Sequence, residues 1–153
     1  AAVRIPELAA GVLRMAEERL RAQSISCRTE FGDAGEIHAD PDMLRRVLLN
    51  LVGNAVDAMP SGGTLTVSAR SRPDGRISVV VEDTGTGIPA EERERIFEPY
   101  FTTKTSGLGL GLFLTKKIVD AHGGEIFVDS TPGKGTRIEV ALPSGPHAGE
   151  AAG

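Results

Sequence analysis

The chain is poor in the residues that build several common kinds of site. Its 153 residues include no tryptophan, one tyrosine and one cysteine. The single cysteine, Cys27, cannot form a disulfide within the chain, and it leaves no thiolate cluster for zinc. Because no base or metal ligand accompanies Cys27 in the sequence, we expect it to be a small core residue. A disulfide framework and a cysteine-based zinc site are therefore excluded.

Long apolar runs and basic blocks are missing as well. No apolar run is long enough to span a bilayer, and the first residues lack the pattern of a signal peptide. The net charge is −4, so nucleic acid and anionic membrane surfaces are not expected as partners. The sequence starts without Met on a predicted helix, and we expect it to be a fragment of a longer protein.

What is present is typical of one soluble α/β domain. Hydrophobic residues make up 40% and charged residues 25% of the chain. The apolar spacing predicts helices over 6–22, 41–59, 89–96 and 109–122, and strands over 25–31, 36–39, 64–70, 76–83, 125–130 and 135–142. Phe31, Phe113 and Phe127 are expected in the core. Residues 1–143 are expected to form the domain and 144–153 a disordered tail.

The helix predicted over 41–59 carries an unusual polar stripe. Asn50, Asn54 and Asp57 are spaced so that they fall on one face. A solvated face is one interpretation, although such faces are usually filled with Lys, Glu or Arg. The other is a cation site, because carboxamide oxygens suit a hard cation such as magnesium. The helix alone leaves both open.

The segment "VVVEDTGTGIP" (79–89) places a carboxylate at the end of a strand. An ionised Asp83 can only accept hydrogen bonds, which suits the exocyclic amine of adenine. Gly85 and Gly87 would let the backbone approach a flat base closely. A plain turn after a strand is the simpler interpretation of this motif by itself.

The segment "SGLGLGLFLTKKIVDAHGG" (106–124) has glycines at alternate positions before a helix. Exposed N–H groups and the helix dipole would favour an anion there, and a glycine-rich loop without a ligand is the alternative. Neither a Rossmann nor a Walker-type site fits, because "FTTKTS" before the glycines is no hydrophobic strand and no GxxxxGK[ST] occurs.

Taken in order, these motifs resemble the catalytic, ATP-binding domain of histidine kinases, part of the superfamily shared with gyrase, heat-shock chaperones and mismatch-repair ATPases. "NLVGNAVDAMP" is similar to the asparagine box, "DTGTGIP" and "GLGLGL" to the two glycine boxes, "FEPYF" to the phenylalanine box and "GKGT" to a closing glycine motif. The resemblance covers about residues 3–143. "NAVDAMPSGGTLTV" and "FEPYFTTK" are most similar to the nitrogen-regulation and dicarboxylate-sensing branch.

The resemblance implies a two-layer sandwich, a mixed β-sheet covered on one face by three helices, and a site for ATP and Mg²⁺. Asn54 would ligate the ion and Asn50 would support it, while Lys104 would be the cation of a mobile lid over 97–108. The implied nucleotide contacts are Asn54, Asp57, Asp83, Gly85, Gly87, Ile88, Thr103, Lys104, Gly107, Leu108, Gly109, Leu110, Gly111, Leu112 and Thr136. The alternating glycines would then cover the phosphates.

One residue departs from the family pattern. Asp57 stands where many histidine kinases carry a basic residue that reaches the phosphates. A carboxylate cannot do this, so Lys104 is expected to matter more here.

The phosphate-accepting histidine is expected outside this chain. In the family it is followed by a carboxylate, whereas His38, His122 and His147 precede alanine, glycine and alanine. The implied partners are the protein's own dimerisation and phosphoacceptor hairpin and the receiver domain of a response regulator. The domain by itself is expected to be monomeric, cytoplasmic and without direct membrane contact.

Two other classes of function remain. One is an ATP hydrolase of the gyrase type, in which a glutamate at the position of Asn50 would activate water. The other is a non-catalytic module whose nucleotide state gates an interaction.

Overall fold

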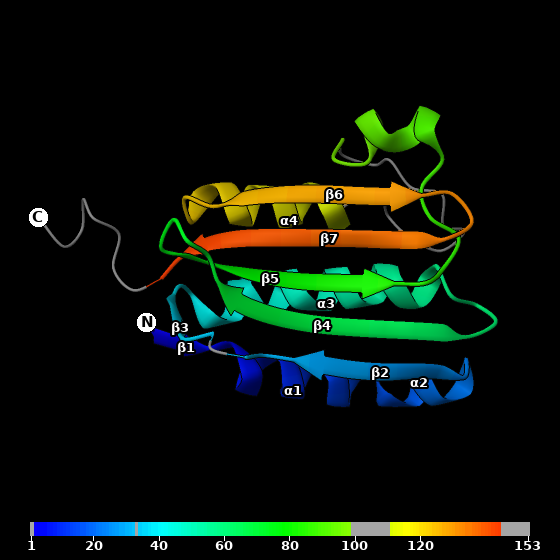
Figure 1. The fold of residues 1–153 in the computed structure, drawn as a ribbon, viewed down its shortest axis with the longest axis horizontal. Helices are drawn as coiled ribbons and strands as arrows, with labels where there is room; N and C mark the ends of the chain where they lie inside the picture. The colour runs from blue at the N-terminus through cyan, green and yellow to red at the C-terminus, as the bar shows by residue number, and fades with distance from the viewer. Residues whose placement is uncertain (1, 33, 99–110, 145–153) are drawn as a thin grey trace, which may run out of the picture.

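The computed structural model describes residues 2–32, 34–98 and 111–144. These described residues form seven strands and four α-helices (Figure 1). The strands are β1 (Ala2–Arg4), β2 (Ile25–Glu30), β3 (Glu36–His38), β4 (Gly63–Ser71), β5 (Arg76–Asp83), β6 (Glu125–Thr131) and β7 (Gly135–Pro143). The helices are α1 (Ile5–Met15), α2 (Glu17–Ala22), α3 (Pro41–Asp57) and α4 (Gly111–Ala121), with a 3-10 helix, η1, over Ala90–Arg95.

Five strands form the main sheet in the order β2-β4-β5-β7-β6, and β1 pairs with β3 in a separate two-stranded sheet. β2 runs parallel to β4, and the other pairs of the main sheet are antiparallel, so the sheet is mixed. The central strand is β5. Its last residue, Asp83, lies opposite Leu65 of β4 and Thr136 of β7.

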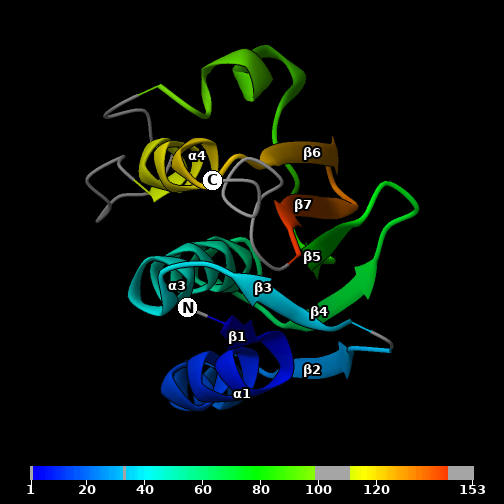
Figure 2. The same cartoon turned by 90° about the vertical axis from the view of Figure 1, so that its left-hand side faces the viewer.

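The helices lie on one face of this sheet. Figure 2 shows α1, α3 and α4 side by side, with α3 in the middle. The predicted mixed sheet covered on one face by three helices is therefore confirmed. The core between the layers is aliphatic, and its buried side chains include Leu48 and Leu51 of α3 and Val79 and Val81 of β5.

The central helix α3 has well-defined ends. Asp40 caps its first turn, because one carboxylate oxygen accepts hydrogen bonds from the N–H groups of Asp42 (2.9 Å) and Met43 (3.3 Å). Pro41 occupies the first turn, where its missing N–H is harmless. The helix ends at Asp57, three residues before Pro60. Its polar stripe therefore lies in the middle and at the end of the helix.

The structure differs from the predicted elements at the N-terminus. The helix predicted over 6–22 is two helices, because Ala16 (φ −93°, ψ −2°) separates α1 from α2. The first residues form β1 rather than helix, since Ala2–Arg4 pair with β3.

The helix predicted over 89–96 is the short η1, none of whose residues is buried.

Two expected core residues are exposed. Cys27 lies on β2, an edge strand of the sheet, and its side chain is exposed, so its placement in the core was wrong. Phe127 is 42% exposed, which was also wrong, whereas Phe31 is half-buried and packs against the core. No helix in the described part of the chain is long and apolar enough to cross a membrane.

Candidate functional site

Asp83 ends the central strand with a buried side chain, of which 8% is exposed. Its Oδ1 accepts a hydrogen bond from the Gly85 N–H at 2.8 Å. Burial raises the pKa of Asp83 above its ordinary value, although hydrogen bonds from the N–H groups of Gly85 and Thr136 oppose the shift. The Asp83 carboxylate is thus a buried hydrogen-bond acceptor. A ligand that offers it no donor would leave it unpaired and would bind weakly.

The loop after Asp83 packs closely against the end of α3 and against the end of β6. A Cβ on Gly85 would lie 2.2 Å from the carbonyl oxygen of Ala58, at the end of α3, and this same oxygen accepts a hydrogen bond from the Thr86 N–H at 3.1 Å. Gly87 has φ +73°, and a Cβ there would lie 2.4 Å from the carbonyl oxygen of Thr131. Both glycines are therefore required by close approach to neighbouring backbone, whereas the close approach to a base that the motif predicted stays a prediction.

Thr136 lies beside Asp83 and belongs to a small buried hydroxyl cluster. Its Oγ1 is 2.9 Å from Oγ of Ser130, which also accepts a hydrogen bond from the Ile88 N–H at 2.7 Å and donates to the Gly135 carbonyl oxygen at 3.1 Å. Ser130 is 2% exposed. The sequence analysis missed Ser130. The feature that could have identified it is a polar residue of β6 at a position whose side chain faces the core.

Asn50 joins α3 to the start of α4. Its Nδ2 donates to the Gly111 carbonyl oxygen at 3.3 Å and to Oγ1 of Thr115 at 3.4 Å. The Thr115 hydroxyl itself donates to the Gly111 oxygen at 2.8 Å and is fully buried. The structure therefore brings Asn50 to the helix that follows the glycine-rich segment. Thr115, which the sequence reasoning also missed, completes this contact.

The rest of the polar stripe continues along α3 toward its end. Asn54 follows Asn50 by about one turn and is half-buried. Asp57, the last residue of the helix, is 2.7 Å from Nη2 of Arg19 on α2. The stripe thus has neighbours on both sides, with α4 at one end and α2 at the other.

The donor set suits a hard cation better than a soft one. Among residues 2–32, 34–98 and 111–144, no three His, Cys, Asp or Glu side chains gather to hold a metal. The amides of Asn50 and Asn54 offer neutral oxygens, which magnesium accepts when phosphates supply the charge. Since Nδ2 of Asn50 donates to two oxygens of α4, its Oδ1 is the atom that can face an ion or its water.

Several expected nucleotide contacts lie outside the described residues. They are Thr103, Lys104, Gly107, Leu108, Gly109 and Leu110, together with most of the predicted lid. The remaining two contacts at this end are Gly111 and Leu112. Gly111 begins α4, with no atom of the described residues within 4 Å of where a Cβ would stand, and Leu112 is half-buried against the core. Ile88 is held by its N–H, which bonds to Ser130.

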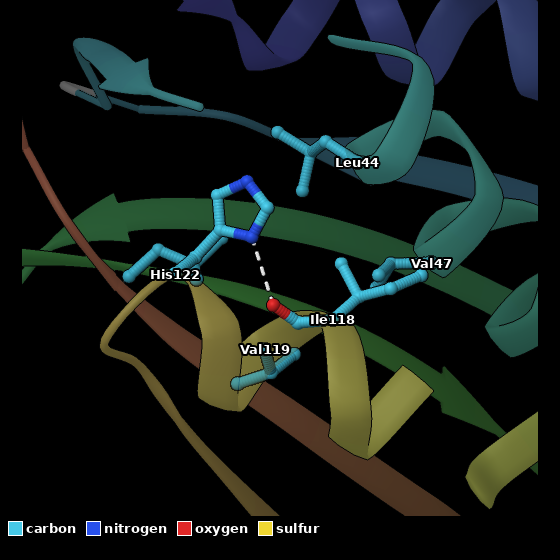
Figure 3. Close-up of a pocket in the computed structure, with 6 residues that line it drawn as sticks. Leu44, Val47, Ile118, Val119 and His122 are labelled. Atoms are coloured by element: carbon cyan, nitrogen blue, oxygen red, sulfur yellow. Dashed lines mark hydrogen bonds between the residues drawn. The ribbon is translucent and has the colours of Figure 1, made fainter. Parts of the chain in front are cut away.

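A separate apolar recess lies toward the other ends of α3 and α4 (Figure 3). It is lined by Leu44, Val47, Ile118, Val119, His122 and Leu142. The ring of His122 spans it: Nδ1 donates to the Ile118 carbonyl oxygen at 2.8 Å, and Nε2 accepts from the Asp40 N–H at 3.2 Å. Apart from this ring, whose two nitrogens both have partners, the residues that line the recess are apolar, which does not suit a phosphate.

Comparison with known proteins gives one family. Residues 39–146 match the family described as "Histidine kinase-, DNA gyrase B-, and HSP90-like ATPase". The chain is 50% identical to the sensor histidine kinase ZraS of Klebsiella oxytoca over 107 residues, 70% of this chain and 23% of that protein. It is 38% identical to sporulation kinase A of Bacillus subtilis over 140 residues, 91% of this chain and 23% of that protein. The chain therefore spans under a quarter of either relative.

Solved structures agree with these relatives. The catalytic domain of histidine kinase ThkA superposes with a TM-score of 0.84 at 33% identity, covering 94% of this chain and 95% of that one. ThkA in complex with the response regulator protein TrrA gives a TM-score of 0.81 at 30% identity, covering 95% of this chain and 42% of that one.

Proposed function

The chain belongs to the family of histidine kinase-, DNA gyrase B- and HSP90-like ATPases, and we propose that it is the ATP-binding catalytic domain of a sensor histidine kinase, as its relatives are named. From this premise we propose that it binds Mg-ATP and donates the γ-phosphoryl group to a histidine on a separate domain of its parent protein. The observation that carries the proposal is the buried carboxylate of Asp83, which ends the central strand and begins the D-x-G-x-G loop.

Asp83 and Thr136 would bind the adenine. The carboxylate can accept from the exocyclic amine of adenine, whereas a guanine carbonyl at that point would face a negative charge. Gly85 and Gly87 let the loop pack directly against Ala58 and Thr131, which holds its backbone beside Asp83. Ser130 positions Thr136 and the N–H of Ile88, so it acts through its neighbours.

Asn54, supported by Asn50, would hold the magnesium ion at the phosphate end. When bound, the ion neutralises charge on the phosphates during transfer. Asn50 also fixes the first turn of α4, whose N-terminal N–H groups favour an anion. Asp57 and the residues outside the described ranges, Thr103, Lys104 and Gly107 to Leu110, are proposed as further contacts.

In the transfer, a ring nitrogen of the acceptor histidine attacks the γ-phosphorus with its lone pair. The bond from that phosphorus to the β–γ bridging oxygen breaks, and ADP leaves with the electron pair. The proton of the phosphorylated ring passes to a carboxylate beside the acceptor. This chain's residues hold and orient the nucleotide, and among the described histidines His122 is engaged between α3 and α4.

Hydrolysis is the competing function within the family. It needs a base that activates water, and position 50 carries a neutral amide, which cannot accept a proton at ordinary pH. A non-catalytic nucleotide-binding module is the other alternative, and it predicts binding without any phosphoryl transfer.

We place the domain in the cytoplasm, where ATP is available, with residues 1–143 as its extent and the domain by itself monomeric. Its proposed partners are the hairpin that carries the acceptor histidine and a response regulator. The second is supported by the relative ThkA, which was determined in complex with a response regulator. The assignment to the nitrogen-regulation branch stays a prediction.

The test is a phosphotransfer assay with γ-labelled ATP. The chain alone should bind ATP and transfer nothing, and mixing it with the hairpin of its parent should label one histidine. The bond formed should be broken by acid and survive alkali. ATP binding without any labelling of that hairpin would favour the non-catalytic module.

A further inference from the structure

The end of α3 carries an ion pair with a residue of another helix. Nη2 of Arg19, on α2, lies 2.7 Å from Oδ1 of Asp57, and the two side chains are 54% and 31% exposed. We propose that Arg19, held in place by Asp57, is the cation that contacts the phosphates of the nucleotide at this end of α3. The proposal rests on the function proposed above and adds a residue to that site.

The ion pair is not needed to attach α2 to α3. Gln23, just after α2, already donates from Nε2 to the carbonyl oxygens of Val56 (2.9 Å) and Met59 (3.2 Å) at the end of α3. A pair as exposed as Arg19–Asp57 adds little to stability. A carboxylate at the C-terminal end of a helix is moreover unfavourable with the helix dipole. What the pair does accomplish is to fix one guanidinium group at a defined place.

That place adjoins the nucleotide site on two sides. Asp57 follows the proposed magnesium ligand Asn54 by three residues, so the two are neighbours on the helix surface. The next residue, Ala58, accepts the Thr86 N–H at 3.1 Å and touches Gly85 in the loop that follows Asp83. Asp57 therefore holds Arg19 where the last turn of α3, which carries Asn54, meets the loop that follows Asp83.

The guanidinium can serve both partners at once. It carries five N–H donors in a planar fork, and Asp57 engages it through Nη2, which also reaches Oε1 of Gln23 at 3.4 Å. The other nitrogens can donate to a phosphate while the carboxylate keeps the group in position. Asp57 alone would repel the phosphates, whereas Asp57 paired with Arg19 presents a neutralised charge and a set of donors.

This arrangement accounts for the departure of position 57 from the family pattern. Where the resemblance implies a basic side chain on α3 itself, this chain has a carboxylate that recruits one from α2. The basic side chain therefore belongs to α2 and not to α3, and its ion pair with Asp57 holds it beside α3.

The experiment compares Arg19→Gln with Arg21→Gln in the 153-residue chain. Arg21 is the matched control, because it lies on the same helix and also makes an ion pair, with Glu17 of that helix at 3.1 Å. Calorimetry with Mg-ATP and with adenosine gives both affinities for each variant. Arg19→Gln should lower Mg-ATP affinity about tenfold, as expected for one charge-assisted contact, and leave adenosine affinity unchanged. Arg21→Gln should change neither.

A rescue variant tests the position of the charge. Asp57→Lys combined with Arg19→Gln returns a cation to the end of α3 and should recover most of the lost Mg-ATP affinity. Unchanged Mg-ATP affinity in Arg19→Gln would overturn the proposal, as would equal losses for Mg-ATP and adenosine, which indicate a structural role. If the unmodified chain binds neither ligand, the proposed function itself fails, so the two failures are distinguishable.

Discussion

Asp83 and Thr136 lie directly opposite each other on the antiparallel strands β5 and β7, and both side chains are buried. The Thr136 N–H donates to the Asp83 carboxylate, and the Thr136 hydroxyl is 2.9 Å from that of Ser130. An adenine amine that reaches Asp83 therefore enters a site whose donors and acceptors are already fixed. This arrangement leads to two predictions about Asp83.

The first is that Asp83→Asn weakens the binding of ATP and adenosine equally. The amide keeps an oxygen that can accept from Gly85, yet it loses the charge that binds the adenine amine. Loss of one charge-assisted hydrogen bond of about 1.5–3 kcal/mol lowers affinity by roughly one to two orders of magnitude. Calorimetry on the folded variant measures this. Unchanged affinity for both ligands would remove Asp83 from the site.

The second concerns pH. Burial raises the pKa of Asp83 above its ordinary value of 3.8. The folded chain then holds this proton more tightly than the unfolded chain does, so the contribution of Asp83 to stability falls as pH rises from 3.8 to the raised value. Asp83→Asn removes this penalty and should be at least as stable as the unmodified chain at pH 7. Adenosine affinity of the unmodified chain should fall as pH drops through the raised pKa.

Urea unfolding at a series of pH values checks the first part, and adenosine titrations over the same series check the second. An Asp83→Asn variant that is clearly less stable at pH 7 would mean that the carboxylate stabilises the fold. In that case its burial would not be a feature kept for ligand binding.

The third prediction concerns Asn54. Asn54→Ala should reduce the gain in ATP affinity that magnesium gives, and leave adenosine binding unchanged, because only the phosphate end uses the ion. Arg46→Ala is a suitable control, since Arg46 is an exposed residue of the same helix. Titrations with and without magnesium give both quantities. Equal magnesium enhancement in Asn54→Ala and the unmodified chain would make Asn54 an ordinary polar helix residue.

Local chemistry explains what the sequence could predict. The predicted helix start at 41 follows from the neighbouring cap Asp40. Gly85 and Gly87 mark a place of close backbone approach, and the neighbours that the structure shows there are Ala58 and Thr131. The strands of the main sheet follow from alternation, which is also local. The stripe of Asn50 and Asn54 on one face of α3 follows from helical spacing.

The residues missed are those whose role depends on distant partners. Thr115 meets Asn50 across 65 positions and Arg19 meets Asp57 across 38, and no local pattern marks either pair. Phe127 was wrongly predicted to lie in the core for a related reason. It lies opposite Glu139 on the face of the sheet that has no helices, with the guanidinium of Arg72 5.8 Å from its ring centre. Hydrophobicity alone does not say which face of a strand is covered.

The last prediction separates a kinase from a hydrolase through Asn50. Its amide nitrogen donates to the Gly111 carbonyl and the Thr115 hydroxyl oxygen, so the side chain fastens α4 and has no proton-accepting nitrogen or charged oxygen for water. The chain alone should therefore release phosphate from ATP very slowly, and Asn50→Ala should not slow it further. The same variant should lower the free energy of unfolding by about 1–3 kcal/mol, because the buried Thr115 hydroxyl oxygen loses its donor, although the Gly111 carbonyl keeps the Thr115 hydroxyl. Asn50→Glu should destabilise the chain at least as much, since a carboxylate cannot donate to either oxygen. Phosphate release and urea unfolding on the same preparations measure both effects. Rapid phosphate release by the unmodified chain, abolished in Asn50→Ala, would assign the protein to the hydrolases instead.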